Sequence, residues 1–370
     1  MSTPSPPATT PRQSNSAHPK TARRLSWDVV RVLAVLAVIF THTTYMGPYL
    51  HPELGHPLTP HPFQVGASAL LVISAYFVCV TVRKDGSTIS WLWRRYARVV
   101  PPYLAAVVIT YTALTLFGPD QWTLPTPHDL WGNLTLASSF DPTVRMIDGS
   151  YWTLPLQLMA FTTAAVLWPR GALSGQRVTV LLWVMILAPV ILQWNDRIAN
   201  SPLWVIQLWN GFGIHRLQLF AIGIAIWLWS KHRIGLVHLG ALLVATVFAH
   251  HAQTQDLPSA LGMGVLLVVV AGAARGPDWT VFEPVRRPVQ FLAKISFGIY
   301  LLNQELGYLV AWQLMELGVG RVGQIAGAVT AAILLAWLLT RYVEQPAYRL
   351  LTTFKPVRRL GVRAVSWLST

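Results

Sequence analysis

Long apolar runs with few charges recur along almost the whole chain, and they restrict its fold more than any other feature. Each run holds roughly 17 to 25 residues, the length that an α-helix needs to cross about 30 Å of hydrocarbon. The runs predict an all-α polytopic membrane protein with about ten transmembrane helices. Their approximate ranges are 27–46, 64–82, 99–118, 152–168, 178–194, 214–230, 236–251, 257–274, 292–312 and 322–340.

The charges between these runs predict the orientation, because cytoplasmic loops of membrane proteins are enriched in Lys and Arg. With the amino terminus inside, the inner segments hold the basic clusters, which are Lys20, Arg23 and Arg24; Arg83, Lys84, Arg94, Arg95 and Arg98; Arg170 and Arg177; Lys231 and Arg233; Arg275, Arg286, Arg287 and Lys294; and the tail from Arg341 to Arg363. The outer segments collect acids and few cations, chiefly Arg145, Arg197, Arg216 and Arg321. Both termini are therefore expected in the cytoplasm, and the chain in the inner (plasma) membrane. An error of one helix would invert this separation, whereas an error of two adjacent helices would preserve it.

The net charge of +14 would suggest a nucleic-acid partner in a soluble protein. This chain is 53% hydrophobic and only 11% charged, whereas soluble domains carry about 25% charged residues. Because the cations follow the membrane topology, we expect the lipid bilayer and no nucleic acid as a partner. The single cysteine, Cys79, excludes an intramolecular disulfide and is expected to be a buried thiol.

One transmembrane domain, residues 25–350, is expected between two polar tails. Residues 1–24 are rich in Pro, Ser and Thr and lack the apolar stretch of a secretion signal, which predicts a disordered cytoplasmic tail. Residues 351–370 are expected to form a basic cytoplasmic tail. The longest polar segment, about 119–151, is too short for an independent core.

Ionisable residues in the first apolar run are candidates for function, because charge inside a bilayer is costly. Arg31 and His42 are eleven residues apart, so a helix would place them about 20° apart around its axis and about 16 Å apart along it. Both side chains would then face one path across much of the bilayer. In the alternative interpretation, Arg31 reaches back to the surface beside Asp28, and His42 rests at the opposite interface.

Other polar residues carry weaker signals. His51, His56 and His61 repeat every five residues in a Pro-rich outer loop, but no Cys or carboxylate cluster completes a metal site, so none is expected. Glu305, inside the ninth run, could bond a neighbouring helix or face a cavity.

Seven motifs then occur in one order over about 320 residues. They are Arg24–Arg31 with His42, Leu71–Phe77, Arg94–Tyr103, Tyr151–Leu154, Arg216–Gly223, Ser296–Leu302 and Glu344–Pro346. Each is weak alone, but together they resemble the integral-membrane acyltransferase family 3, of the bacterial O-acyltransferase type. The chain departs from that pattern at three places: Gln157 stands where the family usually has Glu, Asn303 where a His is common, and Val29 where a Gly is usual.

The resemblance implies that residues 25–350 form a transmembrane acyltransferase domain with acyl-coenzyme A, in the expected case acetyl-coenzyme A, as co-substrate and no permanently bound cofactor. Arg95 and Arg98, three residues apart on one helix face, would bind the donor phosphates. The alternative is that they only anchor the helix at the inner surface.

The resemblance also implies a catalytic group of His42, Arg31 and Asp28. His42 would act as general base on the acceptor hydroxyl, because an unperturbed imidazole titrates near neutrality. Asp28 would fix Arg31 through the three-residue spacing. Tyr300 or Gln157 would donate hydrogen bonds near the reacting carbonyl. The expected substrate-binding or supporting residues are Trp152, Gln157, Tyr300 and Glu305.

The expected activity is transfer of an acyl group to a sugar hydroxyl of a cell-surface glycan, a lipid-linked sugar or a glycosylated metabolite. The alternative is a membrane transporter or channel in which Arg31 and His42 line a path without chemistry. A third interpretation, a non-catalytic membrane partner, arises because Gln157 and Asn303 replace ionisable family residues.

Overall fold

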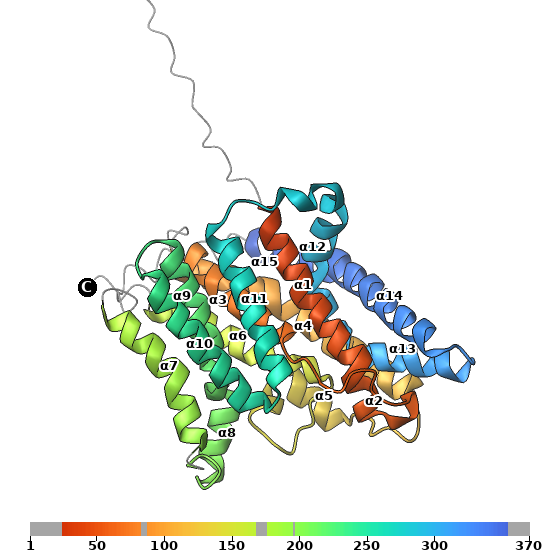
Figure 1. Cartoon of the computed structure of the whole chain (residues 1–370). Coiled ribbons are helices and arrows are strands. Elements are labelled where there is room, and N and C mark those ends of the chain that lie inside the picture. The colour runs from red at the N-terminus through yellow and green to blue at the C-terminus, as the bar shows by residue number, and fades with distance from the viewer. Residues whose placement is uncertain (1–23, 83–86, 168–175, 195–196, 354–370) are drawn as a thin grey trace, which may run out of the picture.

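The computed structural model describes residues 24–82, 87–167, 176–194 and 197–353, and all regular elements in these ranges are helical (Figure 1). In chain order, the α-helices are α1 (Leu25–Thr41), α2 (Gly47–Leu50), α3 (Gly66–Thr81), α4 (Thr88–Phe117), α5 (Pro127–Leu134), α6 (Thr153–Leu167), α7 (Gln176–Trp194), α8 (Leu203–Gly211), α9 (Leu217–Ser230), α10 (Leu236–Thr254), α11 (Leu257–Arg275), α12 (Arg286–Leu302), α13 (Glu305–Glu316), α14 (Arg321–Leu339) and α15 (Gln345–Thr353). Short π-helices, His42–Met46 and Thr340–Glu344, continue α1 and α14.

The all-α prediction is confirmed for the described residues, and each of the ten predicted ranges overlaps a helix. Within the described residues, seven helical stretches are long and apolar enough to cross a membrane, namely Leu25–Leu50, Thr88–Phe117, Arg177–Trp194, Leu203–Ser230, Leu236–Thr254, Leu257–Arg275 and Arg321–Thr353. Helix α3 is apolar but shorter, with 16 residues. The chain is therefore a multi-pass membrane protein, and the count of about ten spans stays a prediction.

The predicted ninth span, 292–312, is wrong as a single helix, because the chain breaks between α12 and α13. The side-chain amide of Asn303 donates to the carbonyls of Ile299 and Tyr300, at 3.0 and 2.9 Å, and so satisfies the end of α12. The Glu305 N–H donates to Asp148 Oδ2 at 3.1 Å at the start of α13. Polar groups from a distant segment thus compensate for the interrupted helix.

Two other predicted boundaries differ from those in the structure. Helix α4 begins at Thr88 rather than near residue 99, and the Ser87 side chain caps this start by accepting from the Ser90 N–H at 3.4 Å. Helix α15 runs through Thr353, into the segment predicted as the carboxyl-terminal tail. The rest of that tail and residues 1–23 lie outside the described residues.

Helices α1 and α3 join two apolar clusters. One cluster packs these helices against α7, α9, α10 and α11, and the other packs them against α4, α6, α12 and α13. At Gly66 the first turn of α3 meets the backbone of α1 directly, since a Cβ there would lie 2.5 Å from the Val38 nitrogen. Such close contact between membrane helices requires a residue without a side chain.

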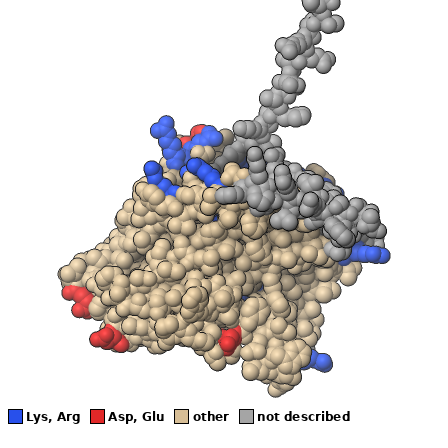
Figure 2. Space-filling view, turned by 180° about the vertical axis from the view of Figure 1, so that it is seen from behind, with Lys and Arg blue, Asp and Glu red and all other residues tan. Residues whose placement is uncertain are grey.

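The two ends of the helix bundle differ in charge. Helix α1 begins where α11 ends, because the Leu25 and Ser26 N–H groups donate to the Asp278 carboxylate at 3.0 and 2.7 Å. Lys and Arg gather mainly at this end, at the top of Figure 2, while Asp and Glu gather mainly at the other. We call these the basic end and the acidic end. The separation matches the positive-inside pattern expected from the sequence.

Candidate active site

His42 lies at the first position of the π-helix that continues α1. Its Nδ1 is 2.7 Å from Asn303 Oδ1. The Asn303 side-chain nitrogen already donates to two carbonyls, so its oxygen must be the atom that faces His42. An amide oxygen can only accept, so Nδ1 of a neutral His42 carries the proton and Nε2 keeps its lone pair. π-helices occur frequently at functional sites, in agreement with this placement.

A cavity of about 200 Å³, which we call the histidine chamber, lies beside this imidazole. Helices α1, α3 and α12 and the segment before α6 contribute its walls. Its lining residues are Val38, Thr41, His42, Met46, Gln64, Gly66, Ala67, Ser68, Gly149, Ser150, Trp152, Arg216, Tyr300 and Gln304. Hydroxyl and amide side chains therefore surround an imidazole and one guanidinium, without a carboxylate among them.

A second cavity of about 160 Å³, the arginine chamber, holds four cations, Arg31, Arg95, Arg98 and Lys294. Like the histidine chamber, it is lined by α1, α3 and α12, and α4 and α6 also contribute. No carboxylate from the described part of the chain lines it. Such a cavity suits a polyanionic ligand.

Each cation of the α4 pair is held differently. The Arg95 guanidinium donates to Thr81 Oγ1 at 2.7 Å and lies 5.5 Å from the ring centres of Trp91 and Phe161. Arg98, with a side chain 60% exposed, pairs with Glu344 at 3.4 Å. The Arg95 guanidinium is thus held in position before any ligand binds, whereas Arg98 lies close to the surface.

The two chambers share Tyr300 and Ala67. The Tyr300 hydroxyl donates to the Ser150 carbonyl at 2.6 Å and accepts from Thr153 Oγ1 at 2.9 Å. Its proton is therefore committed to the protein, and Tyr300 shapes the junction rather than offering the hydrogen bond expected from the sequence. Gln157 lines the arginine chamber.

Three other predicted site residues lie in different places. Asp28 is buried in the first turn of α1 and lines neither chamber. Trp152 lines the histidine chamber under the Arg216 guanidinium. Glu305 instead lines a small separate cavity with His51 and Arg145, so the structure does not bring it to His42.

The outer-loop histidines diverge instead of gathering. His51 stacks on Trp122 with ring centres 3.8 Å apart, and His61 Nδ1 lies 2.8 Å from Asp256. Within the described ranges, no group of three or more His, Cys, Asp or Glu residues could hold a metal ion.

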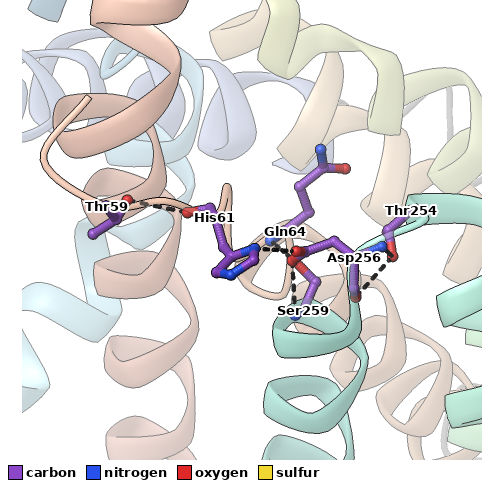
Figure 3. Close-up of polar contacts among 6 residues, drawn as sticks. All are labelled: Thr59, His61, Gln64, Thr254, Asp256 and Ser259. Atoms are coloured by element: carbon purple, nitrogen blue, oxygen red, sulfur yellow. Dashed lines mark hydrogen bonds and ion pairs between the residues drawn. The ribbon is translucent and has the colours of Figure 1, made fainter. Parts of the chain in front are cut away.

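The loop before α3 is tied to the start of α11 by the polar contacts drawn in Figure 3. His61 pairs with Asp256, while the Gln64 N–H donates to Ser259 Oγ at 2.8 Å. Asp256 also accepts from the Ser259 N–H at 2.9 Å and so caps α11. Because Gln64 lines the histidine chamber, these contacts hold one wall of that chamber in place.

An Asp256→Asn variant should unfold at a lower temperature than the wild type at neutral pH. Burial raises the pKa of Asp256, but hydrogen bonds from Ser259 and contact with His61 outweigh it and hold the pKa below its usual value of 3.8. The carboxylate therefore stabilises the fold at neutral pH, and this contribution is lost as the pH falls through the folded pKa. His61 is 44% exposed, so water screens the pair and the effect should be no more than about 1 kcal/mol.

Thermal unfolding in detergent at several pH values measures this contribution. An Asp256→Ala variant should lose about 1 kcal/mol more, because Asn still caps a helix and Ala does not. Equal midpoints for wild type and Asp256→Asn at neutral pH would contradict the assignment.

Residues 24–341 match the acyltransferase-3 family, whose shared region is described as an acyltransferase domain. The chain belongs to this family. It is 24% identical over 386 residues to the acyltransferase MdmB of Streptomyces mycarofaciens, covering 92% of this chain and 95% of that protein. No solved structure matches the chain. The chain is therefore a membrane-embedded acyltransferase, as the motifs indicated.

The sequence did not predict the places of Asn303 and Arg216 in this site. Asn303 stood out only as a departure from the family pattern, yet it makes the hydrogen bond that orients His42. The sequence motifs included Arg216 but predicted no function for it. In the structure it lines the same chamber as His42. Its position in an outer segment poor in cations was the signal available in the sequence.

Proposed function

We propose that this acyltransferase moves an acyl group, acetyl in the simplest case, from cytoplasmic acyl-coenzyme A to a sugar hydroxyl. The sugar would belong to a cell-surface glycan, a lipid-linked sugar or a glycosylated metabolite. One observation carries the proposal: a cation-lined chamber and a chamber holding an imidazole meet at Tyr300 and Ala67. Donor and acceptor could therefore reach one point from different sides.

The arginine chamber suits the donor. Coenzyme A carries several phosphates, and guanidinium groups bind phosphate oxygens in bidentate geometry. Arg31 lies in the half of α1 nearest the basic end, and Lys294 lies at the middle of α12. If the basic end faces the cytoplasm, as the positive-inside rule favours, this chamber lies on the side where acyl-coenzyme A is available.

The histidine chamber suits a polyhydroxylated acceptor. Thr41, Gln64, Ser68 and Gln304 place hydroxyl and amide groups around it, and such groups can donate to or accept from sugar hydroxyls. The His42 Nε2 lone pair is the basic group available at this wall.

The proposed reaction is a direct transfer. His42 Nε2 removes the proton from the acceptor hydroxyl while the hydroxyl oxygen attacks the thioester carbonyl. A carbon–oxygen bond forms, the carbon–sulfur bond breaks, and the leaving coenzyme A thiolate takes the proton from the imidazolium. Arg31 would hold the donor arm that leads to the junction, and Asp28 would act only by positioning the start of α1.

Sealed membrane vesicles of opposite orientation test this proposal. Acetyl-coenzyme A with a labelled acetyl group is added outside inverted vesicles, which expose the cytoplasmic face, or outside right-side-out vesicles. We expect labelled glycoside or glycan only with the inverted vesicles. Label transfer in neither preparation, or equal transfer in both intact preparations, would contradict the proposal.

An Asn303→Leu variant should lower kcat by about tenfold, because His42 would lose the hydrogen bond that selects its tautomer. The KM for acyl-coenzyme A should change little, because Asn303 does not line the arginine chamber. An Asn303→His variant, which restores the residue common in the family, should retain more activity. Steady-state kinetics measures both constants, and a wild-type kcat in Asn303→Leu would refute this role.

A further inference from the structure

Arg216 introduces a guanidinium into the histidine chamber at the end of the short helix Ile214–Arg216, just before α9. It lies over the Trp152 ring, 4.7 Å from the ring centre. Its Nε is fully buried and has no hydrogen-bond partner. No carboxylate among the described residues lies within ion-pair distance of this group, in contrast to Arg98, which pairs with Glu344. Arg216 is thus held by an aromatic ring and faces the cavity.

None of the residues that the structure describes supplies a counter-ion within this chamber. The nearby Asp148 carboxylate is fully buried and occupied, since it accepts from the Ser150 N–H at 2.8 Å, the Ser150 hydroxyl at 2.5 Å and the Glu305 N–H at 3.1 Å. The Glu305 side chain lines a different cavity. His42 and Tyr300, the other titratable groups that line the chamber, offer no negative charge, since the Tyr300 hydroxyl keeps its proton in the hydrogen bond to the Ser150 carbonyl.

A partly buried cation without a counter-ion is costly, and an arginine cannot escape that cost by losing its proton. Aromatic contact compensates only in part. An anion entering the chamber would balance the charge of the guanidinium that lines it, and carboxylates and phosphates match guanidinium geometry.

We propose that the acceptor carries an anionic group, a phosphate or a carboxylate, which Arg216 binds in the histidine chamber. This inference rests on the proposed function, because it defines the substrate class of the same chamber. Arg216 then positions the acceptor so that its hydroxyl reaches His42 Nε2. A sugar acid, a soluble sugar phosphate and a membrane-held sugar phosphate share this chemistry.

Anion binding without turnover tests the proposal. The purified protein is saturated with coenzyme A, which occupies the arginine chamber, and the phosphorus NMR linewidth of added inorganic phosphate is titrated. Wild type should bind phosphate, and Arg216→Gln should bind it at least about tenfold more weakly. Arg216→Lys should retain part of the binding. The matched control is Arg197→Gln, which removes an exposed arginine and should bind phosphate as wild type does.

Competition then separates the sources of the anion. Methyl glucuronide, glucose 1-phosphate and dodecyl phosphate represent a sugar acid, a soluble phosphate and a membrane-held phosphate, and the strongest competitor indicates the source. Methyl glucoside, which is neutral, should not compete. Absence of phosphate binding in wild type, or equal binding in wild type and Arg216→Gln, would overturn the proposal.

This measurement is independent of acyl transfer. Phosphate binding through Arg216 in a protein that transfers no label would leave the anion site standing and refute the proposed function alone. Acyl transfer by a protein that does not bind phosphate through Arg216 would refute the anion site and leave the proposed function standing. If Arg216 served only the reacting oxyanion, Arg216→Gln would lower kcat and leave phosphate binding unchanged, which also counts against the proposal.

Discussion

A His42→Gln variant is expected to transfer acyl groups about a thousandfold more slowly than the wild type, because it lacks a side chain that can accept the hydroxyl proton. Gln keeps polar atoms near Asn303, so the fold around the π-helix should persist. Binding of acyl-coenzyme A should remain close to wild type, since His42 does not line the arginine chamber. Single-turnover transfer of a labelled acetyl group, combined with equilibrium donor binding, separates the two effects.

The matched control is His128→Gln, which removes an exposed imidazole on α5 and should retain wild-type activity. Loss of donor binding in His42→Gln would mean that the variant is misfolded or that the chambers are not separate. Wild-type transfer by His42→Gln would refute general-base catalysis by this residue.

An Arg95→Gln variant should bind acyl-coenzyme A about thirtyfold more weakly, because one charge-assisted contact with a phosphate is lost. Arg95 is the preorganised member of the arginine chamber, held by Thr81 and by two aromatic rings. Its guanidinium therefore needs little reorganisation to bind an anion, and Gln cannot replace its charge. Titration of purified variants with acetyl-coenzyme A measures the change.

Two controls accompany this titration. Arg94→Gln removes the adjacent arginine, which does not line the chamber, and should leave donor binding unchanged. Acetyl-pantetheine, a thioester without the nucleotide phosphates, should bind Arg95→Gln and wild type equally. Equal losses for both donors would indicate that Arg95 supports the fold rather than the phosphates.

Hydropathy predicts helices well in this protein because each apolar run must satisfy its own backbone groups within a bilayer. It fails at 292–312, where the run stays apolar on both sides of Asn303 and Gln304. The break depends on Asp148, which lies 157 positions before the Glu305 N–H that it accepts from. No local pattern reveals such a contact. The same break brings Asn303 to His42, so this error in the helix prediction also hid part of the site.

The fold class, the charge separation along the chain and the family all follow from the order of the amino acids, because apolar length, basic loops and ordered motifs are local properties. The sequence also identified His42, Arg31, Arg95 and Arg98 as candidates. The packing of the helices divides these residues between two chambers and places Tyr300 where the chambers meet. It also brings Arg216 into the chamber of His42, with no carboxylate of the described residues lining that chamber. The reason is physical: cavities and hydrogen bonds join residues from helices far apart in the chain, and their geometry depends on how the helices pack.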